Sequence, residues 1–168
     1  MDDVVEIAPA IAPEGPDDAA AALALVDRVF GPGRYAKAAE RLREGNRFLP
    51  DLSFVAREAG RLVGTVRLWP VRIGDRPALL LGPIAVDSSA RDKGIGAALV
   101  ERACQAAAQA GHAVVVLVGD EAYFVRLRFG RPPAGPLAMP GPVDFGRILV
   151  RGLKPGALDG LMGQVRLP

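Results

Sequence analysis

Residues 85–103, AVDSSARDKGIGAALVERA, join an apolar run to a helical one through glycines and charged side chains. The preceding run, ALLLGPIAV at 78–86, is apolar throughout, as expected for a strand buried on both faces. Residues 94–111 carry apolar side chains at helical spacing, and HAVVVLVG at 112–119 indicates a second buried strand. Residues 78–118 are therefore predicted to form a βαβ unit with a right-handed crossover between parallel strands.

The junction between the first strand and this helix has the features of a phosphate site. The first N–H groups of a helix have no partner within it and carry the positive end of its dipole. Gly94 and Gly96 let an anion approach these amides, and Arg91 and Lys93 add positive charge. Nucleotide binding is a weaker alternative: the Walker pattern is absent, and Leu99 occupies the third position of a dinucleotide fingerprint.

The remaining elements are expected around this unit. Segment 19–30 is predicted to be a helix with Leu23, Val26 and Phe30 on one face, and Pro83 is predicted to interrupt strand pairing. The other predicted elements are a strand at 4–11, a helix from about 35 to 44, a hairpin at 53–71 turning at Ala59-Gly60, a short helix at 121–127 and a strand near 146–153. The order is β-α-α-β-β-β-α-β-α-β, an α/β mixed sheet in one domain spanning 1–168.

Composition excludes several classes of function. The chain has 168 residues, with Lys+Arg 21 against Asp+Glu 19, so its net charge of +2 argues against a nucleic-acid partner. No apolar run approaches the roughly 20 residues of a membrane span. A lone cysteine, Cys104, and an acidic start fit a cytoplasmic protein. His112 is the only histidine, so no metal site is expected.

The pattern R-x-x-G-x-G at 91–96, after a strand ending in IAV, resembles the acyl-CoA-binding motif of the GCN5-related N-acetyltransferase (GNAT) superfamily. The chain is also similar to a bacterial branch of predicted small-molecule acetyltransferases at LGPIAVDSSARDKGIGAALV, LVGDEAYFVRLRF and LKPGALDGLMGQVRLP. The resemblance implies a GNAT-type fold with splayed parallel strands. It also implies direct transfer of acetyl from acetyl-CoA (coenzyme A) to an amine of a small molecule or peptide, by a monomer or homodimer.

The resemblance also assigns residues to the cofactor. The backbone of Ile84, Ala85 and Val86 is implied to hydrogen-bond the pantetheine arm as an added strand would. Asp120 and the helix after it are implied to lie beside the thioester. The residues implied to hold the pyrophosphate are Arg91, Asp92, Lys93, Gly94, Ile95 and Gly96, and Ala97 is implied to be a further cofactor-binding residue.

The chain departs from the family at its general acid. Many relatives carry a tyrosine four residues before a Gly-Phe pair, but in YFVRLRF that position is Phe124, and Arg128 replaces the glycine. Tyr123, one residue earlier, is the predicted substitute, although adjacent helical positions lie about 100° apart. Tyr123 and Asp120 are the candidate catalytic residues. The alternative is a catalytically weak protein that binds acyl-CoA as a sensor or interaction module.

Acceptor specificity is expected to rest on the first two helices and on the loops at 46–53 and 130–142. Trp69 is expected either to line the acceptor pocket or to pack in the core.

Overall fold

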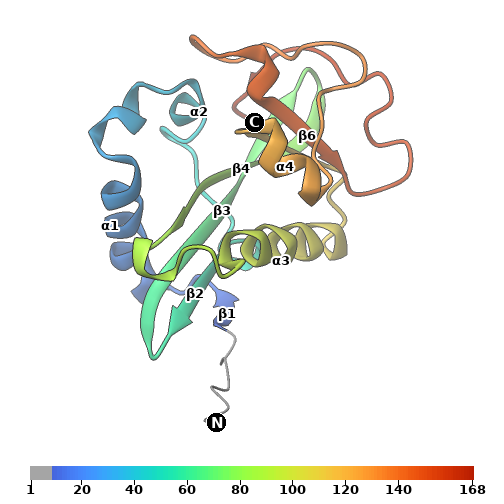
Figure 1. Ribbon diagram of the computed structural model, residues 1–168. Coiled ribbons are helices and arrows are strands. Elements are labelled where there is room, and N and C mark those ends of the chain that lie inside the picture. The colour runs from blue at the N-terminus through green and yellow to red at the C-terminus, as the bar shows by residue number, and fades with distance from the viewer. Residues whose placement is uncertain (1–8) are drawn as a thin grey trace.

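The computed structural model describes residues 9–168 and has a mixed sheet with helices on both faces (Figure 1). The strands are β1 (Ala10–Pro13), β2 (Phe54–Glu58), β3 (Arg61–Ile73), β4 (Arg76–Val86), β5 (Val114–Val118), β6 (Ile148–Gly152) and β7 (Val165–Arg166). The helices are α1 (Ala19–Phe30), α2 (Ala38–Arg41), α3 (Ile95–Gln109) and α4 (Glu121–Phe124). Short 3₁₀ turns are found at Pro16–Asp18, Pro32–Ala36, Pro50–Leu52, Ser88–Ala90, Val125–Leu127 and Phe145–Arg147.

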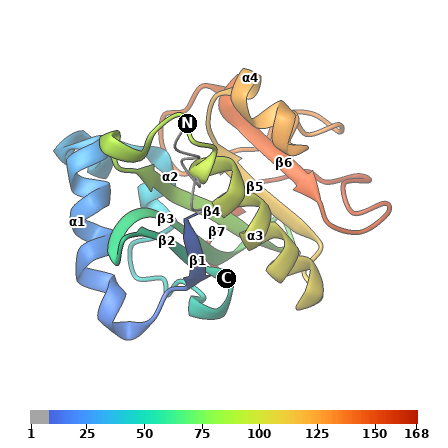
Figure 2. The same ribbon diagram turned by 60° about the horizontal axis from the view of Figure 1, so that its bottom comes forward.

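The sheet runs β1-β2-β3-β4-β5-β6, with β7 paired to β3 (Figure 2). Only β4 and β5 are parallel, and α3 connects them, so the predicted βαβ unit is confirmed. The predicted order of elements is confirmed as far as β6, and the mixed α/β class is also confirmed. The tight β2–β3 turn is at Ala59 and Gly60, both with positive φ, as the sequence predicted.

The two faces of the sheet have separate cores. Helix α3 buries Leu99, Val100 and Ala103 against one face, where Leu79 and Leu117 of the sheet also pack. On the other face, α2 and the segments after α4 pack against alternate residues of β3, β4 and β5. Helix α1 covers the same second face farther along β4, where Leu25 and Val26 contact Ala85.

Three expectations about individual elements differ from the structure. Helix α1 buries Ala22, Leu25 and Val26, whereas Leu23 is 45% and Phe30 39% exposed. The helix expected at 35–44 is a 3₁₀ turn followed by the four residues of α2, and β7 was not predicted. The first strand begins at Ala10, and residues 4–8 of the expected strand lie outside the described part of the chain.

Candidate functional site

The parallel strands β4 and β5 separate towards their carboxyl ends. They pair only at Leu79–Val115 and Leu80–Val116, although β4 continues to Val86. On its other side β4 stays paired with β3, but the register shifts so that β4 holds one extra residue opposite Val66–Leu68. The extra residue falls in the segment that contains Pro83, so the predicted interruption at this proline is confirmed. The shift leaves a gap beside the end of β4.

The alternation of an antiparallel ladder determines which backbone groups face this gap. Asp87 donates its N–H to the carbonyl of Val63, and the register then pairs Ala85 with Thr65 by hydrogen bonds. The N–H and C=O groups of Ile84 and Val86 consequently point away from β3, into the gap. The prediction for the pantetheine contacts therefore narrows to Ile84 and Val86, because the N–H and C=O groups of Ala85 are already hydrogen-bonded to β3.

The loop after β4 leads into α3 through a tight turn. The side chain of Asp87 accepts hydrogen bonds from the backbone N–H and the hydroxyl of Ser89, which lower its pKa to about 2. Gly94, the N-cap residue, has a φ of 75° and open space where a Cβ would lie. The first intrahelical bond there runs from Ala98 N–H to Gly94, so the amides of 95–97 have no partner within the helix.

A groove of about 610 Å³ lies in front of these amides. Its lining brings together most of the residues predicted to bind the pyrophosphate, together with the side chains of Tyr123 and Arg126. The predicted residues in the lining are Val86, Arg91, Asp92, Gly94, Ile95, Gly96 and Ala97. Lys93 is not among them, because its ammonium pairs with Glu58 at 3.3 Å. Arg126 was not predicted, and it supplies a second cation beside Arg91.

A cavity of about 280 Å³ opens beyond the other end of the unpaired segment. Its floor is apolar and is formed by the separating ends of β4 and β5 and by the ring of Phe124. Its walls come from the end of α1, the 3₁₀ turn and α2 that follow it, and the 142–147 loop. The charged side chains in its lining are Arg34, Lys37, Arg43, Asp144 and Arg147.

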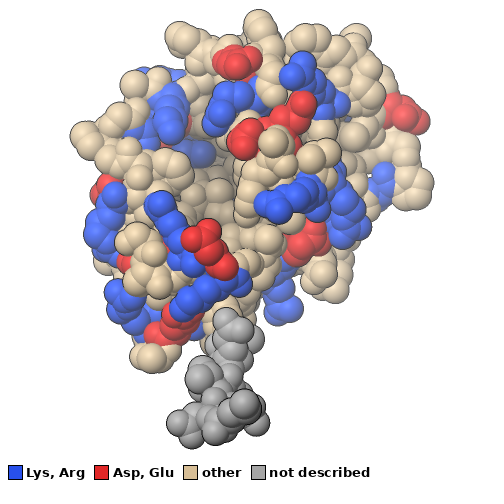
Figure 3. Space-filling view, viewed as in Figure 1, with Lys and Arg blue, Asp and Glu red and all other residues tan. Residues whose placement is uncertain are grey.

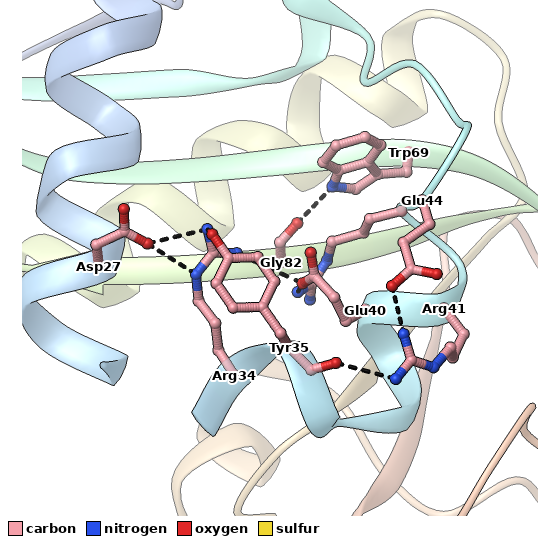
Figure 4. Close-up of polar contacts among 9 residues, drawn as sticks. Asp27, Arg34, Tyr35, Glu40, Arg41, Glu44, Trp69 and Gly82 are labelled. Carbon is pink, nitrogen blue, oxygen red and sulfur yellow. Dashed lines mark hydrogen bonds and ion pairs between the residues drawn. The ribbon is translucent and has the colours of Figure 1, made fainter. Parts of the chain in front are cut away.

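Ion pairs fix two of these cations in place. Glu40 accepts hydrogen bonds from Arg43 at 3.0 Å and from Arg34 at 3.5 Å. Arg34 also donates to Asp27 at 3.0 Å and to the hydroxyl of Tyr35 at 2.7 Å (Figure 4). Burial lowers the pKa of the Arg43 guanidinium, and Glu40 opposes that shift. The carboxylate of Glu40 thus holds both guanidinium groups beside the cavity.

Trp69 lies behind the wall of this cavity and does not line it, so of the two roles expected for it the structure shows packing in the core. It is buried, packs edge-on against Phe48 and donates its indole N–H to the carbonyl of Gly82 at 2.6 Å. It also lines a second cavity, which shares Arg34, Arg43 and Pro83 with the first. The indole therefore supports the β4 segment at which the strands separate.

The two candidate catalytic residues lie outside the cavity lining. The hydroxyl of Tyr123 is 3.1 Å from the position that a Cβ on Gly96 would take, which places it in the groove. Asp120 precedes α4 and is exposed. Of the neighbours Tyr123 and Phe124, it is Phe124 that lines the cavity, with its ring packed edge-on against Tyr123 and Phe129.

The charged residues of the cavity were not predicted individually. The first two helices do contribute, as expected, but the 46–53 loop does not line the cavity, and Pro142 is its only contribution from 130–142. The charges of α2 and its flanks follow no recognised spacing. Only the fold brings them beside Arg147, more than a hundred residues later in the chain.

Comparison with known proteins identifies the family. The sequence profile of the Acetyltransferase (GNAT) family matches residues 21–127. The chain is also 32% identical over 155 residues to the uncharacterized N-acetyltransferase YhbS of Escherichia coli K12, covering 90% of this chain and 92% of that protein. The chain therefore belongs to the GNAT acetyltransferase family.

Two solved structures extend this comparison. The crystal structure of Escherichia coli YhbS in complex with CoA has a TM-score of 0.82 at 30% identity, covering 96% of this chain and 90% of that one. A GNAT family acetyltransferase from Brucella melitensis in complex with acetyl-CoA has a TM-score of 0.67 at 26% identity, covering 95% and 96%. The fold class predicted from the sequence is confirmed by both.

Within residues 9–168, no helix combines the length and the apolar character needed to cross a membrane.

Proposed function

We propose that this protein transfers the acetyl group of acetyl-CoA directly to the amine of a small molecule or peptide. One observation carries the proposal: the unpaired edge of β4 joins an anion-binding groove to a separate cavity. Val86 lines the groove and Ile84 lines the cavity, so an extended arm bound along this edge would connect the two. The CoA and acetyl-CoA complexes of the two related structures support acetyl-CoA as the cofactor.

The residues of the groove fit the chemistry of the cofactor. Unpaired amides at 95–97 and the cations Arg91 and Arg126 favour a pyrophosphate. The free N–H and C=O groups of Ile84 and Val86 match the alternating amides of pantetheine, as in addition of a strand to a sheet edge. The thioester would then lie at the apolar floor of the cavity.

Acetyl transfer in the cavity needs a free amine. The amine nitrogen bonds to the thioester carbon, the carbon–sulfur bond breaks, and the nitrogen loses one proton. Asp144, at the exposed end of the cavity, is its only carboxylate among residues 9–168, and it accepts a hydrogen bond from the N–H of Gly146. The surrounding cations lower the pKa of a bound ammonium, so they favour the uncharged nucleophile and release of its proton to solvent.

The proposal gives Tyr123 a role in holding the pyrophosphate of the cofactor, because its hydroxyl lies in the groove beside Gly96. We expect Tyr123→Phe to weaken acetyl-CoA binding by about tenfold, because one hydrogen bond to a charged group is lost, and to change kcat less than about threefold. Steady-state kinetics and calorimetry with acetyl-CoA separate the two effects. A fall in kcat of about 10²–10⁴-fold at unchanged affinity would instead establish Tyr123 as the general acid predicted from the sequence.

Phe124 is the position at which a proton donor would face the cavity. We expect Phe124→Tyr to raise kcat by about tenfold, because a phenol there can protonate the leaving thiolate. Release of free thiol in the presence of saturating amine measures the effect. An unchanged or lower kcat at unchanged affinity for acetyl-CoA would show that the thiolate needs no donor at this position.

Titration calorimetry with acetyl-CoA, ATP and NAD tests the cofactor assignment. We expect micromolar binding of acetyl-CoA and much weaker binding of both nucleotides, since neither has an arm that can pair with the edge of β4. Equal affinity for ATP would favour nucleotide binding at this loop. Binding of acetyl-CoA without acetylation of any amine would favour the sensor alternative.

We also propose that residues 1–168 act as one domain, in a monomer or homodimer, because one chain supplies both the groove and the cavity. A lone cysteine supports a reducing, cytoplasmic location. The relatives in Escherichia coli and Brucella melitensis support a bacterial cell. Burial raises the pKa of the Cys104 thiol to about 11, so this group is not a nucleophile for the reaction.

A further inference from the structure

The cavity at the end of the β4–β5 gap is lined by more positive than negative side chains. Arg34, Lys37, Arg43 and Arg147 contribute cations, and Asp144 contributes the single carboxylate of the lining within residues 9–168. Figure 3 shows Lys and Arg side chains, with Asp and Glu side chains next to them, along the upper rim of a hollow on this face of the molecule. The walls of the cavity therefore favour anionic groups of a ligand, whereas its apolar floor does not.

These cations are not equally available to a ligand. Arg34 is paired with Asp27 and Glu40, and Arg43 is paired with Glu40. The ion pairs found among residues 9–168 include neither Lys37 nor Arg147. Lys37 instead lies 5.0 Å from the centre of the Phe30 ring. Two cations that line the cavity thus have no anionic partner in this part of the chain.

A buried donor adds to this preference. The Nε atom of Arg43 is buried and has no hydrogen-bond partner in the structure of residues 9–168. Because an unsatisfied buried donor is unfavourable, the site favours a ligand, or a water held by one, that accepts a hydrogen bond there. The backbone of the 142–147 loop is also fixed, since Gly119 donates its N–H to the carbonyl of Arg147 at 2.8 Å. Arg147 therefore projects from an anchored position beside the end of β5.

We propose that the acceptor is an amine that also carries an anionic group, a carboxylate or a phosphate, and that Lys37 and Arg147 bind this group. The inference rests on the proposed function, because it concerns the second substrate of that reaction. The anion would bind at the cationic wall while the amine reaches the thioester over the apolar floor. Polyamines and other acceptors with several positive charges are disfavoured, because the same cations repel them.

Matched amines test the proposal. We expect kcat/KM to be about tenfold higher for phenylalanine than for phenylalaninamide, or for O-phosphoethanolamine than for ethanolamine, since each anion gains charge-assisted hydrogen bonds. A preference in the first pair identifies a carboxylate acceptor, and a preference in the second identifies a phosphate acceptor. Equal or better use of the neutral amine in both pairs, or a preference for spermidine, overturns the proposal.

Variants assign the preference to the two cations. We expect Arg147→Gln and Lys37→Gln each to lower the anionic-to-neutral ratio by about tenfold, and Arg147→Lys to retain most of it. Arg72→Gln is the matched control, because Arg72 is near the β3–β4 turn and donates to the carbonyl of Asp75. An unchanged ratio in both Gln variants overturns the proposal.

A product-binding measurement separates this inference from the proposed function. If acetyl-CoA binds but no amine is acetylated, the proposed function fails, and calorimetry with the acetylated products still tests the anion site. One pair of ligands is N-acetylphenylalanine and its amide. The other pair is N-acetylated O-phosphoethanolamine and N-acetylated ethanolamine. Binding of an acid or phosphate about tenfold tighter than its neutral counterpart, lost in Arg147→Gln, supports the site. Equal binding within both pairs overturns it.

Discussion

Replacing Gly96 with leucine is expected to weaken acetyl-CoA binding by at least about 100-fold. This factor corresponds to the loss of two charge-assisted hydrogen bonds. A Cβ at this position would lie 3.1 Å from the hydroxyl of Tyr123 and 3.7 Å from a methyl group of Val86. The larger side chain of Gly96→Leu would extend into the groove and keep the pyrophosphate from the amides at the start of α3. Titration calorimetry with acetyl-CoA measures the loss.

Ala108→Leu is the matched control for this experiment. Ala108 is exposed near the other end of α3, so the same side chain there leaves the groove unchanged. We expect wild-type affinity in Ala108→Leu and similar melting temperatures in both variants. Wild-type affinity in Gly96→Leu would place the cofactor elsewhere and would contradict the assignment of the groove.

The second large effect is expected at Glu40, which is 8% exposed and holds two guanidinium groups. Glu40→Gln leaves Arg34 with Asp27 alone and leaves Arg43 without a carboxylate. Removing one partner of a buried charge cluster costs about 3 kcal/mol, which for a domain of this size lowers Tm by roughly 6–12 °C. Urea denaturation and a thermal melt measure the change.

Glu44→Gln is the control for Glu40→Gln. Glu44 pairs with Arg41 at the surface, and both side chains are about half exposed. Such pairs contribute less than about 1 kcal/mol, so we expect little change in stability. Equal effects of the two substitutions would contradict the structural role of Glu40. Comparing the two variants also tests whether Glu40 positions the cations of the cavity, because only Glu40→Gln releases Arg34 and Arg43 beside it.

The order of elements could be predicted because its signals are local. The glycines and charges of 91–96, the apolar runs on either side and the turn at Ala59-Gly60 each act within a few residues. Pro83 likewise indicated a break in the ladder, because proline cannot donate to it. These features were sufficient for the βαβ unit and for the groove at the start of α3.

The buried face of α1 could not be predicted from the same signals. Of the three residues expected on that face, Val26 is buried, whereas Leu23 and Phe30 are exposed. Phe30 instead lines the cavity and carries Lys37 over its ring. Helical spacing identifies which residues share a face, but tertiary packing decides which face is buried.

The cavity was missed because its residues are brought together only by the fold. Arg34, Lys37 and Arg43 lie in the irregular connection between α1 and β2, and Arg147 lies in the 3₁₀ turn just before β6. The 3₁₀ turn and α2 are too short to show a periodic pattern in the sequence. Strand β7 was not predicted for the same reason, since it has two residues. Residues with such separate origins form no motif in the sequence, so the cavity could be found only in the structure.

The most direct test of the central claim is a reaction of acetyl-CoA with a panel of amines, with release of free thiol and formation of the acetylated amine measured together. We predict that both products form in equal amounts, faster than without protein, and that Gly96→Leu abolishes the reaction while Ala108→Leu preserves it. Tight binding of acetyl-CoA with no thiol release above background for any amine would contradict the claim that this chain is an acetyltransferase.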